Sequence, residues 1–240
     1  MNRTYHVSRG WFLLVMLLLA VLTACQQGHA GKDGSSITKG EESMRLEFIE
    51  AAERGDVTKV QDWIRQGGDL NVVDGRGRTA AMAATHGDRP EVLKLLIEAG
   101  ADINIRDHRS DNPLLLAGAD GLMDILRLAI EAGADTKLTN RYGGTALIPA
   151  SDRGHVEIVR ELLTRTDVDV NHVNNLGWTA LMEAIVLGDG GQNHQQIVKL
   201  LITHGADVNL PDRDGISPLA HASKRGYHEI AGMLQAAGAE

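Results

Sequence analysis

Short apolar segments alternate with polar turns along most of the chain. Within the stretch from Asp74 to Asp107, a glycine-containing turn precedes the apolar segment Ala80 to Thr85, and a second turn precedes a longer segment from Pro90 to Ala99. Proline suits the first position of a helix, and Gly100 can adopt the left-handed backbone that ends one. The pattern therefore predicts a turn followed by two helices within this stretch.

The same pattern recurs at a fixed period. Gly67, Gly100 and Gly133 are spaced 33 residues apart, and so are Gly205 and Gly238. Self-similarity at this period, with a turn and two helices in each unit, resembles the ankyrin repeat. The resemblance implies an all-α solenoid of stacked helix pairs that carry hairpin loops. We place this ankyrin-repeat domain at residues 43–240, with six repeats at residues 41–73, 74–106, 107–139, 140–173, 174–211 and 212–240.

Several departures from the repeat pattern bear on the fold. In the third repeat, Ser110 replaces the turn glycine, Asn112 replaces the threonine and Lys137 replaces the late asparagine. Pro149 lies inside the first helix of the fourth repeat, where we expect it to be tolerated because it falls near the first turn. The fifth repeat has about five extra residues within 188–194, which we predict to form a loop between its two helices.

Some polar residues recur with the repeat and are predicted to support the fold. A threonine at the sixth position of each unit can cap the first helix with its hydroxyl group. The repeated aspartates, among them Asp102 and Asp135, can accept hydrogen bonds from nearby backbone amides. We expect His155 and His221 to be hydrogen-bonded parts of the scaffold rather than metal ligands.

Composition and charge exclude several classes of function. The net charge is −8 and aromatic residues make up 3% of the chain, so neither electrostatics nor base stacking favours a nucleic-acid partner. The single cysteine, Cys25, excludes an intrachain disulfide and a cysteine-based zinc site. The sequence has no phosphate-binding loop, nucleophile elbow or zinc-protease motif. We therefore predict a non-enzymatic protein without a cofactor or a metal.

The N-terminal residues resemble a bacterial lipoprotein signal. Arg3 and Arg9 precede an apolar run of 12 residues from Trp11 to Leu22, which is too short to span a bilayer and has the length of a signal-peptide core. The following residues, Leu22 to Cys25, resemble a lipobox, which implies cleavage after residue 24 and acylation of Cys25. An uncleaved membrane anchor is the alternative. We predict a signal peptide at residues 1–24 and a flexible tether at residues 25–42, and the resemblance favours the periplasmic side of the outer membrane.

Residues that do not repeat are candidates for partner binding. The resemblance to ankyrin repeats implies that a protein partner meets the hairpin tips and the face of the first helices. Arginine, tyrosine and tryptophan, which are enriched in binding hot spots, occur at these tips and suggest an acidic protein partner. Solvated turns also favour charged residues, which is the alternative explanation. The candidate partner-binding residues are Arg76, Arg78, His108, Arg109, Arg141, Tyr142, Leu176, Trp178 and Arg213.

Three classes of function follow from these features. The first is a lipid-anchored interaction module, predicted to be monomeric, that binds a periplasmic or outer-membrane protein. Within this class the partner is either an envelope enzyme that the module protects or a toxin that it blocks as an immunity protein. The second is an envelope enzyme that uses the 188–194 segment or the cluster of histidines. The third is a link to peptidoglycan or anionic lipid through the arginines. We favour the first.

Overall fold

A computed structural model describes residues 38–240, and within this range the chain forms twelve α-helices and no strands. Residues 40–240 pack as one unit. The predicted signal peptide, Cys25 and residues 25–37 of the predicted tether lie outside the described residues. The fold class predicted from the 33-residue period, an all-α solenoid, is confirmed.

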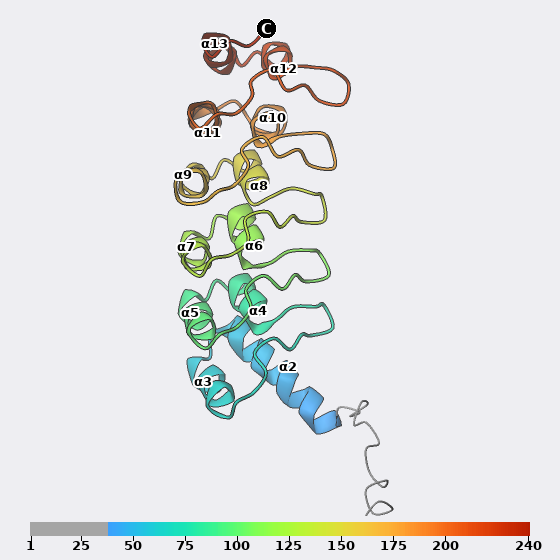
Figure 1. The fold of residues 1–240 in the computed structure, drawn as a ribbon, viewed down its shortest axis with the longest axis vertical. Coiled ribbons are helices and arrows are strands. Elements are labelled where there is room, and N and C mark those ends of the chain that lie inside the picture. The colour runs from blue at the N-terminus through green and yellow to red at the C-terminus, as the bar shows by residue number, and fades with distance from the viewer. Residues whose placement is uncertain (1–37) are drawn as a thin grey trace, which may run out of the picture. The chain divides into compact units, whose positions relative to one another are not determined.

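The helices stack in two layers, and the hairpin loops project from one side of the stack (Figure 1). Each repeat adds one helix to each layer, and helices of neighbouring repeats pack against each other within a layer, from α3 onward in the outer layer and from α4 onward in the inner layer. The inner layer, on the hairpin side, contains α2 (Lys39–Arg54), α4 (Ala80–His86), α6 (Pro113–Asp120), α8 (Leu147–Asp152), α10 (Ala180–Val186) and α12 (Pro218–Arg225). The outer layer contains α3 (Val57–Arg65), α5 (Pro90–Glu98), α7 (Met123–Glu131), α9 (Val156–Arg165), α11 (Gln192–Thr203) and α13 (His228–Ala236).

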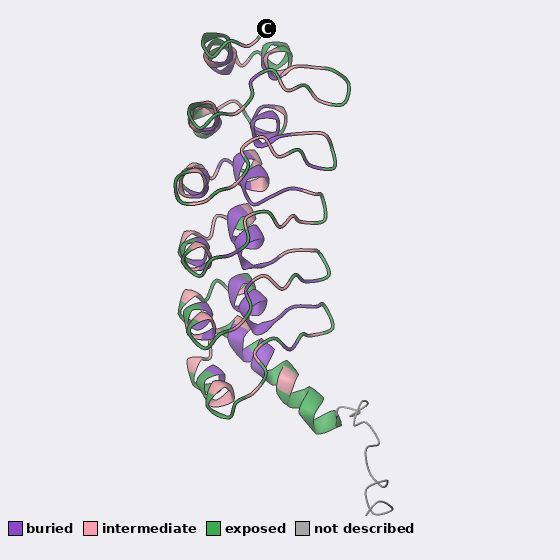
Figure 2. Ribbon diagram, in the orientation of Figure 1, coloured by how far each residue is buried: buried purple, intermediate pink, exposed green. Residues whose placement is uncertain are grey.

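Burial is greatest in the middle of the inner layer (Figure 2). Helix α4 contains four alanines, and all of them are buried, so neighbouring helices approach closely. Each outer helix buries one face only; Leu93 and Leu96 of α5 are fully buried, for example. No repeat could bury its apolar face alone, and stacking therefore supplies the stability.

Four of the first helices begin at a capped residue, as predicted. The side chains of Thr79, Asn112, Thr179 and Ser217 accept hydrogen bonds from backbone N–H groups three residues later, at 2.9–3.2 Å. Such a cap contributes about 1 kcal/mol.

The fourth repeat is an exception to this capping pattern. Helix α8 begins one residue later, at Leu147, and the buried hydroxyl group of Thr145 has no hydrogen-bond partner. The cause is Pro149, which has no N–H group to bond the carbonyl of Thr145, whereas the equivalent Ala83 bonds that of Thr79 at 2.9 Å. Pro149 is tolerated within the first turn, but the cap is lost.

Asparagines in four of the loops that follow the outer helices link neighbouring repeats. The side-chain oxygen of Asn71 accepts a hydrogen bond from the backbone N–H of Asp102 at 2.9 Å, and that of Asn104 accepts one from Asp135 at 2.9 Å. Asn171 and Asn209 make the equivalent bonds. Lys137 occupies this position in the third repeat and provides no such acceptor.

A second set of links joins the start of an outer helix to the preceding repeat. Each link joins a side chain to a backbone carbonyl at or just after the end of the inner helix of the preceding repeat, at 2.8–3.4 Å. The side chains are those of Arg89, His155, His194 and Tyr227. We call this the bridging position. In the third repeat it holds Leu122, whose side chain cannot make the bond.

Two boundaries differ from prediction. Helix α2 begins at Lys39, so residues 39–42 are helical rather than part of a tether; Glu41 and Glu42 in its first turn favour a helix start there. Leu46, an apolar residue of this helix, is 40% exposed, because this half of α2 extends beyond the repeat that it packs against. Helix α11 begins at Gln192, so the predicted loop at 188–194 is also partly helical.

Candidate functional site

The hairpin tips form a continuous ridge. The backbone N–H of His108 bonds the carbonyl of Arg76 at 3.0 Å, and the N–H of Arg141 bonds that of Arg109 at 3.3 Å. The N–H of Asn175 likewise bonds the carbonyl of Tyr142 at 2.9 Å. These bonds hold the tips of repeats two to five in a fixed register.

Most of the predicted partner-binding residues are exposed on this ridge. The exposed members are Arg76, His108, Arg109, Arg141, Tyr142, Leu176 and Arg213, and Trp178 is half-buried. Arg78 was placed among them incorrectly, since it is only 8% exposed. Its guanidinium group pairs with Asp74 and Glu53, each at 2.9 Å, and therefore supports the junction between the first two repeats.

A groove of about 480 Å³ lies behind the tips of the third to fifth repeats. Its lining includes four residues of the predicted set: Arg109, Arg141, Tyr142 and Leu176. A smaller cavity of about 260 Å³ shares His86 and Arg109 with it and extends toward the second repeat. The structure thus brings part of the predicted set to one concave surface, together with inner-helix residues.

The groove also contains a buried carboxyl group, that of Glu183 on α10. The residue is 7% exposed, and its Oε1 accepts a hydrogen bond from the Asn174 side chain at 2.7 Å. Burial raises the pKa of Glu183 to about 7, and the negative charge of Asp152 adds to the effect, against the lowering by the Asn174 hydrogen bond. Glu183 was not among the predicted residues, and because the equivalent position differs from repeat to repeat, nothing in the sequence marks it.

Charges near the rim of the groove interact with their neighbours. The Arg141 guanidinium lies 4.5 Å from the centre of the Tyr142 ring and donates to its hydroxyl group at 3.0 Å. Burial raises the pKa of Asp111, to which the nearby Asp107 also contributes. Asp111 lies 3.8 Å from the Arg109 guanidinium. The rim is therefore mixed in charge rather than uniformly basic.

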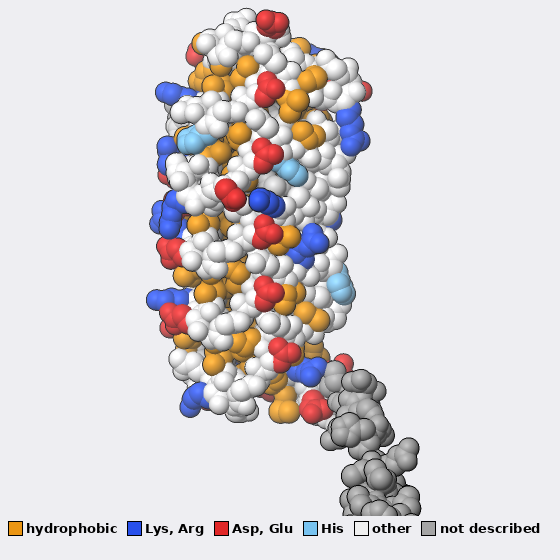
Figure 3. Space-filling view, in the orientation of Figure 1, with side chains coloured by type: hydrophobic (Ala, Val, Ile, Leu, Met, Phe, Trp, Pro, Cys, Tyr) orange, Lys and Arg blue, Asp and Glu red, His pale blue; other side chains and the backbone are white. Residues whose placement is uncertain are grey.

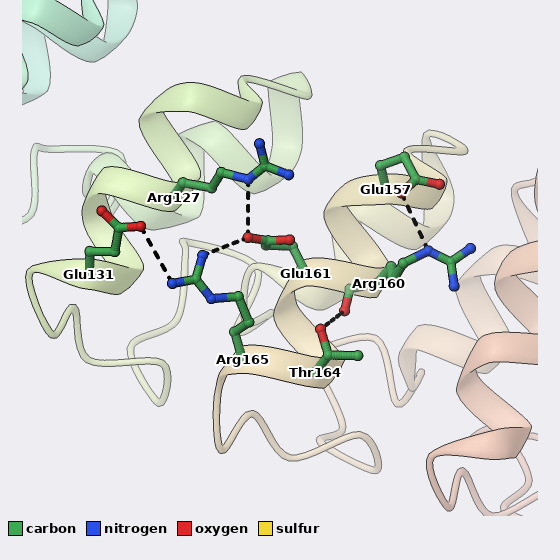
Figure 4. Close-up of polar contacts among 7 residues, drawn as sticks. All are labelled: Arg127, Glu131, Glu157, Arg160, Glu161, Thr164 and Arg165. Carbon is green, nitrogen blue, oxygen red and sulfur yellow. Dashed lines mark hydrogen bonds and ion pairs between the residues drawn. The ribbon is translucent and has the colours of Figure 1, made fainter.

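Charged residues on the outer helices pair with one another (Figure 4). Glu161 on α9 accepts hydrogen bonds from Arg127 of α7 at 3.1 Å and from Arg165 at 2.8 Å, while Arg165 also contacts Glu131 at 3.4 Å. The hydrogen bond from Arg165 lowers the pKa of Glu161. Figure 3 shows acidic side chains recurring along the face of the array, as expected for aspartates that repeat with the fold. These charges belong to the scaffold.

The inserted segment of the fifth repeat is likewise part of the scaffold. His194 is buried between the Asp189 carboxylate at 2.7 Å and the Asp152 carbonyl at 2.8 Å. The Tyr227 hydroxyl bonds the carbonyl of Gly188 at 3.0 Å, which fixes the segment against the sixth repeat. Across residues 38–240, no group of three or more His, Cys, Asp or Glu side chains is arranged to hold a metal ion.

Helices in the described part of the chain are too short or too polar to cross a membrane.

Comparison with known proteins gives consistent matches. The family model described as ankyrin repeats (3 copies) matches residues 48–140, 114–212 and 168–240. YahD, an ankyrin repeat protein of Escherichia coli (strain K12), is 42% identical over 197 residues, which is 82% of this chain and 98% of YahD.

Solved structures of similar chains share the stacked arrangement. An ankyrin repeat domain from Acinetobacter baumannii AYE is 52% identical with a TM-score of 0.79, and the match covers 81% of this chain and 99% of that one. A chain in the structure of the Bd0816 predatory endopeptidase from Bdellovibrio bacteriovorus in complex with immunity protein Bd3460 is 26% identical with a TM-score of 0.68. That match covers 79% of this chain and 96% of the other.

Proposed function

Since the chain belongs to the ankyrin repeat family, we propose that it is a non-enzymatic module that binds a protein partner on its hairpin ridge and groove. The observation that carries the proposal is the continuity of this surface: backbone hydrogen bonds join the tips, and the groove of about 480 Å³ lies directly behind them. A surface that is ordered before binding loses little conformational entropy on binding. Exposed Arg141 and Tyr142 supply residue types common in hot spots.

We place the module in the bacterial cell envelope, anchored through an acylated Cys25 to the periplasmic side of the outer membrane. The support is the lipobox-like sequence Leu22 to Cys25 after an apolar run. Acyl chains contribute about 0.8 kcal/mol per buried methylene, so several chains together anchor stably. Replacing Cys25→Ala is expected to abolish labelling by radioactive palmitate and to release the chain from the membrane fraction. A variant that remains membrane-bound would favour the uncleaved anchor.

An immunity function is a second candidate within the same class. It is supported by the similarity to a chain in the complex of the Bd0816 endopeptidase with immunity protein Bd3460. Such a function requires that the partner be an enzyme whose activity falls when it is bound. A protective function requires that the bound enzyme remain active and survive longer. Assaying the captured partner with and without this chain separates the two.

The binding surface is tested by photocrosslinking in intact cells. A photoreactive residue in place of exposed Tyr142 on the ridge is expected to give a defined adduct with one envelope protein. The same residue in place of Lys94, which is exposed on the outer helix α5, serves as the matched control and should give none. Arg109→Glu combined with Arg141→Glu should reduce the Tyr142 adduct if the partner is acidic. Equal adducts from both positions would refute the assignment of the surface.

A further inference from the structure

The carboxyl group of Glu183 faces the groove with only part of its hydrogen-bonding capacity used. One oxygen accepts from Asn174 at 2.7 Å, and among residues 38–240 no donor bonds the other. The residue is more than nine-tenths buried and lines the groove. Burying a carboxylate without a full set of partners is unfavourable, so this position is suited to a ligand that supplies the missing donor.

A second carboxylate lies in the same groove. Asp152, at the end of α8, is close enough to raise the pKa of Glu183, and no described cation or donor bonds its side chain. The three arginines that line the groove have other partners. Arg153 bonds the Asp120 carboxylate at 2.6 Å and the Ala119 carbonyl at 2.8 Å. Arg109 lies 3.8 Å from Asp111, and Arg141 contacts Tyr142. The groove therefore has two acids without a matching cation.

Apolar side chains adjoin this pair of acids. Tyr142, Leu176 and Leu187 line the groove and are 53%, 50% and 49% exposed, which is high for side chains of their size. The groove thus offers apolar surface beside negative charge. Lysine and arginine match this combination, because each has an aliphatic stem that packs on apolar surface and a cationic end.

We infer that the groove accepts a lysine or arginine side chain of the protein partner, with its cationic group at the carboxylates of Glu183 and Asp152. Its stem then packs against Leu187 and Leu176. The inference rests on the proposed function and specifies one anchor residue of the partner. A partner can carry this basic anchor and still have an acidic surface around it. The acidic surface would meet the exposed arginines on the hairpin tips, and the anchor would meet Glu183 on α10.

The site is expected to depend on pH, because only the ionised form of Glu183 attracts a cation. On the elements around it, Asp152 raises its pKa, Arg153 is paired with Asp120, and the two neighbouring histidines have partners of their own. These are His194 of α11 with Asp189 and His221 of α12 with Asp212. With a pKa of about 7 the ionised fraction rises about tenfold between pH 6 and pH 8.

The test uses a library of displayed peptides selected on the immobilised full-length chain. Retained peptides are expected to share a lysine or arginine beside apolar residues. Glu183→Gln should weaken binding of a retained peptide at least tenfold at pH 8, because glutamine keeps the Asn174 hydrogen bond but removes the charge. Replacing the basic residue of the peptide by norleucine should have the same effect, and the two changes together should add little. Glu91→Gln, which removes an exposed charge from α5, is the matched control and should leave binding unchanged.

Other outcomes overturn the inference and are distinct from failure of the proposed function. Peptides without a basic residue, or binding that resists Glu183→Gln but is lost in Leu187→Asp, would show that the groove takes a different ligand and would leave the proposed function intact. Affinity that does not rise between pH 6 and pH 8 would also contradict the role of Glu183. A library that leaves no peptide on the chain overturns the basic anchor, while the proposed function stands or falls on crosslinking at Tyr142.

Discussion

The Nε2 atom of His194 lies 2.8 Å from the backbone carbonyl oxygen of Asp152, across the boundary between the fourth and fifth repeats. Its Nδ1 atom lies 2.7 Å from the Asp189 carboxylate, within the inserted segment. His155 makes the equivalent contact one repeat earlier, with the Ala119 carbonyl at 3.1 Å. The histidine of the insertion therefore has a structural role that another repeat also shows.

His194→Ala is expected to lower the free energy of unfolding by about 1–3 kcal/mol, since it removes two hydrogen bonds of a buried side chain and leaves the Asp152 carbonyl without this partner. Thermal unfolding followed by circular dichroism measures the change. His204→Ala is the control, because His204 is exposed directly after the same helix and its side chain bonds only the carbonyl of Leu200. Comparable losses in both variants would contradict the bridging role.

Lys137→Asn should stabilise the array by about 0.5–1.5 kcal/mol. Asparagine at this position would supply a side-chain acceptor to the fourth repeat. Asn104 of the second repeat supplies the equivalent acceptor to the backbone N–H of Asp135 in the third repeat. The change also removes a weak exposed ion pair between Lys137 and Asp167 at 4.0 Å, which contributes little. Lys137→Ala removes the same ion pair without supplying an acceptor, so a rise in the denaturation midpoint for both variants would refute the explanation.

Ser110→Gly is expected to stabilise the third hairpin by up to about 1 kcal/mol, because Ser110 has a φ of +63° in a turn where the other repeats have glycine. The gain is reduced by the greater freedom of glycine in the unfolded chain. Gly215→Ser is the reverse change in the equivalent turn of the sixth repeat, where φ is +75° and nothing lies near an added Cβ. Denaturant unfolding should show shifts of opposite sign for the two variants.

Glu183→Gln is expected to stabilise the chain more at pH 8 than at pH 5. Because the pKa of Glu183 is raised to about 7 on folding, the folded chain binds more protons than the unfolded chain between about pH 4.5 and 7. Stability therefore falls as the pH rises through this range, and glutamine removes the fall. We expect a gain of about 1–3 kcal/mol at pH 8 and little change at pH 5. A gain that is independent of pH would show that the carboxyl group titrates normally.

Local features of the repeats were predictable from the sequence because they depend on a few neighbouring residues. Thr79 and Ser217 cap their helices as expected, and Asp102 accepts the backbone N–H of Asn104 at 2.8 Å. The loss of the Thr145 cap was not predicted from the sequence. It becomes visible only when the repeats are aligned, because Pro149 then stands where Ala83 donates its backbone N–H to the Thr79 carbonyl.

Features of the candidate site that depend on contacts between repeats were not predictable. Arg78 has the sequence context of an exposed tip residue, yet Glu53, which lies 25 residues earlier, draws it inward. Glu183 occupies a position that is alanine in α4 and proline in α8, so no shared residue type marks it. Its burial arises from contacts with the neighbouring helices α8 and α12, and the positions of these helices relative to Glu183 cannot be read from the sequence.

The boundary between the second and third repeats is the one boundary within residues 38–240 that lacks a bridging bond, because Leu122 occupies the bridging position. The next boundary lacks the asparagine bond at Lys137, but other contacts span it, among them Arg127 with Glu161 and His155 with the Ala119 carbonyl. Amide protons at the start of α7 should therefore exchange with solvent sooner than those at the starts of the other outer helices, since local opening there breaks fewer bonds. The consequence is a preferred place of local opening beside the smaller cavity, while the Tyr227 bond to Gly188 holds the fifth and sixth repeats together.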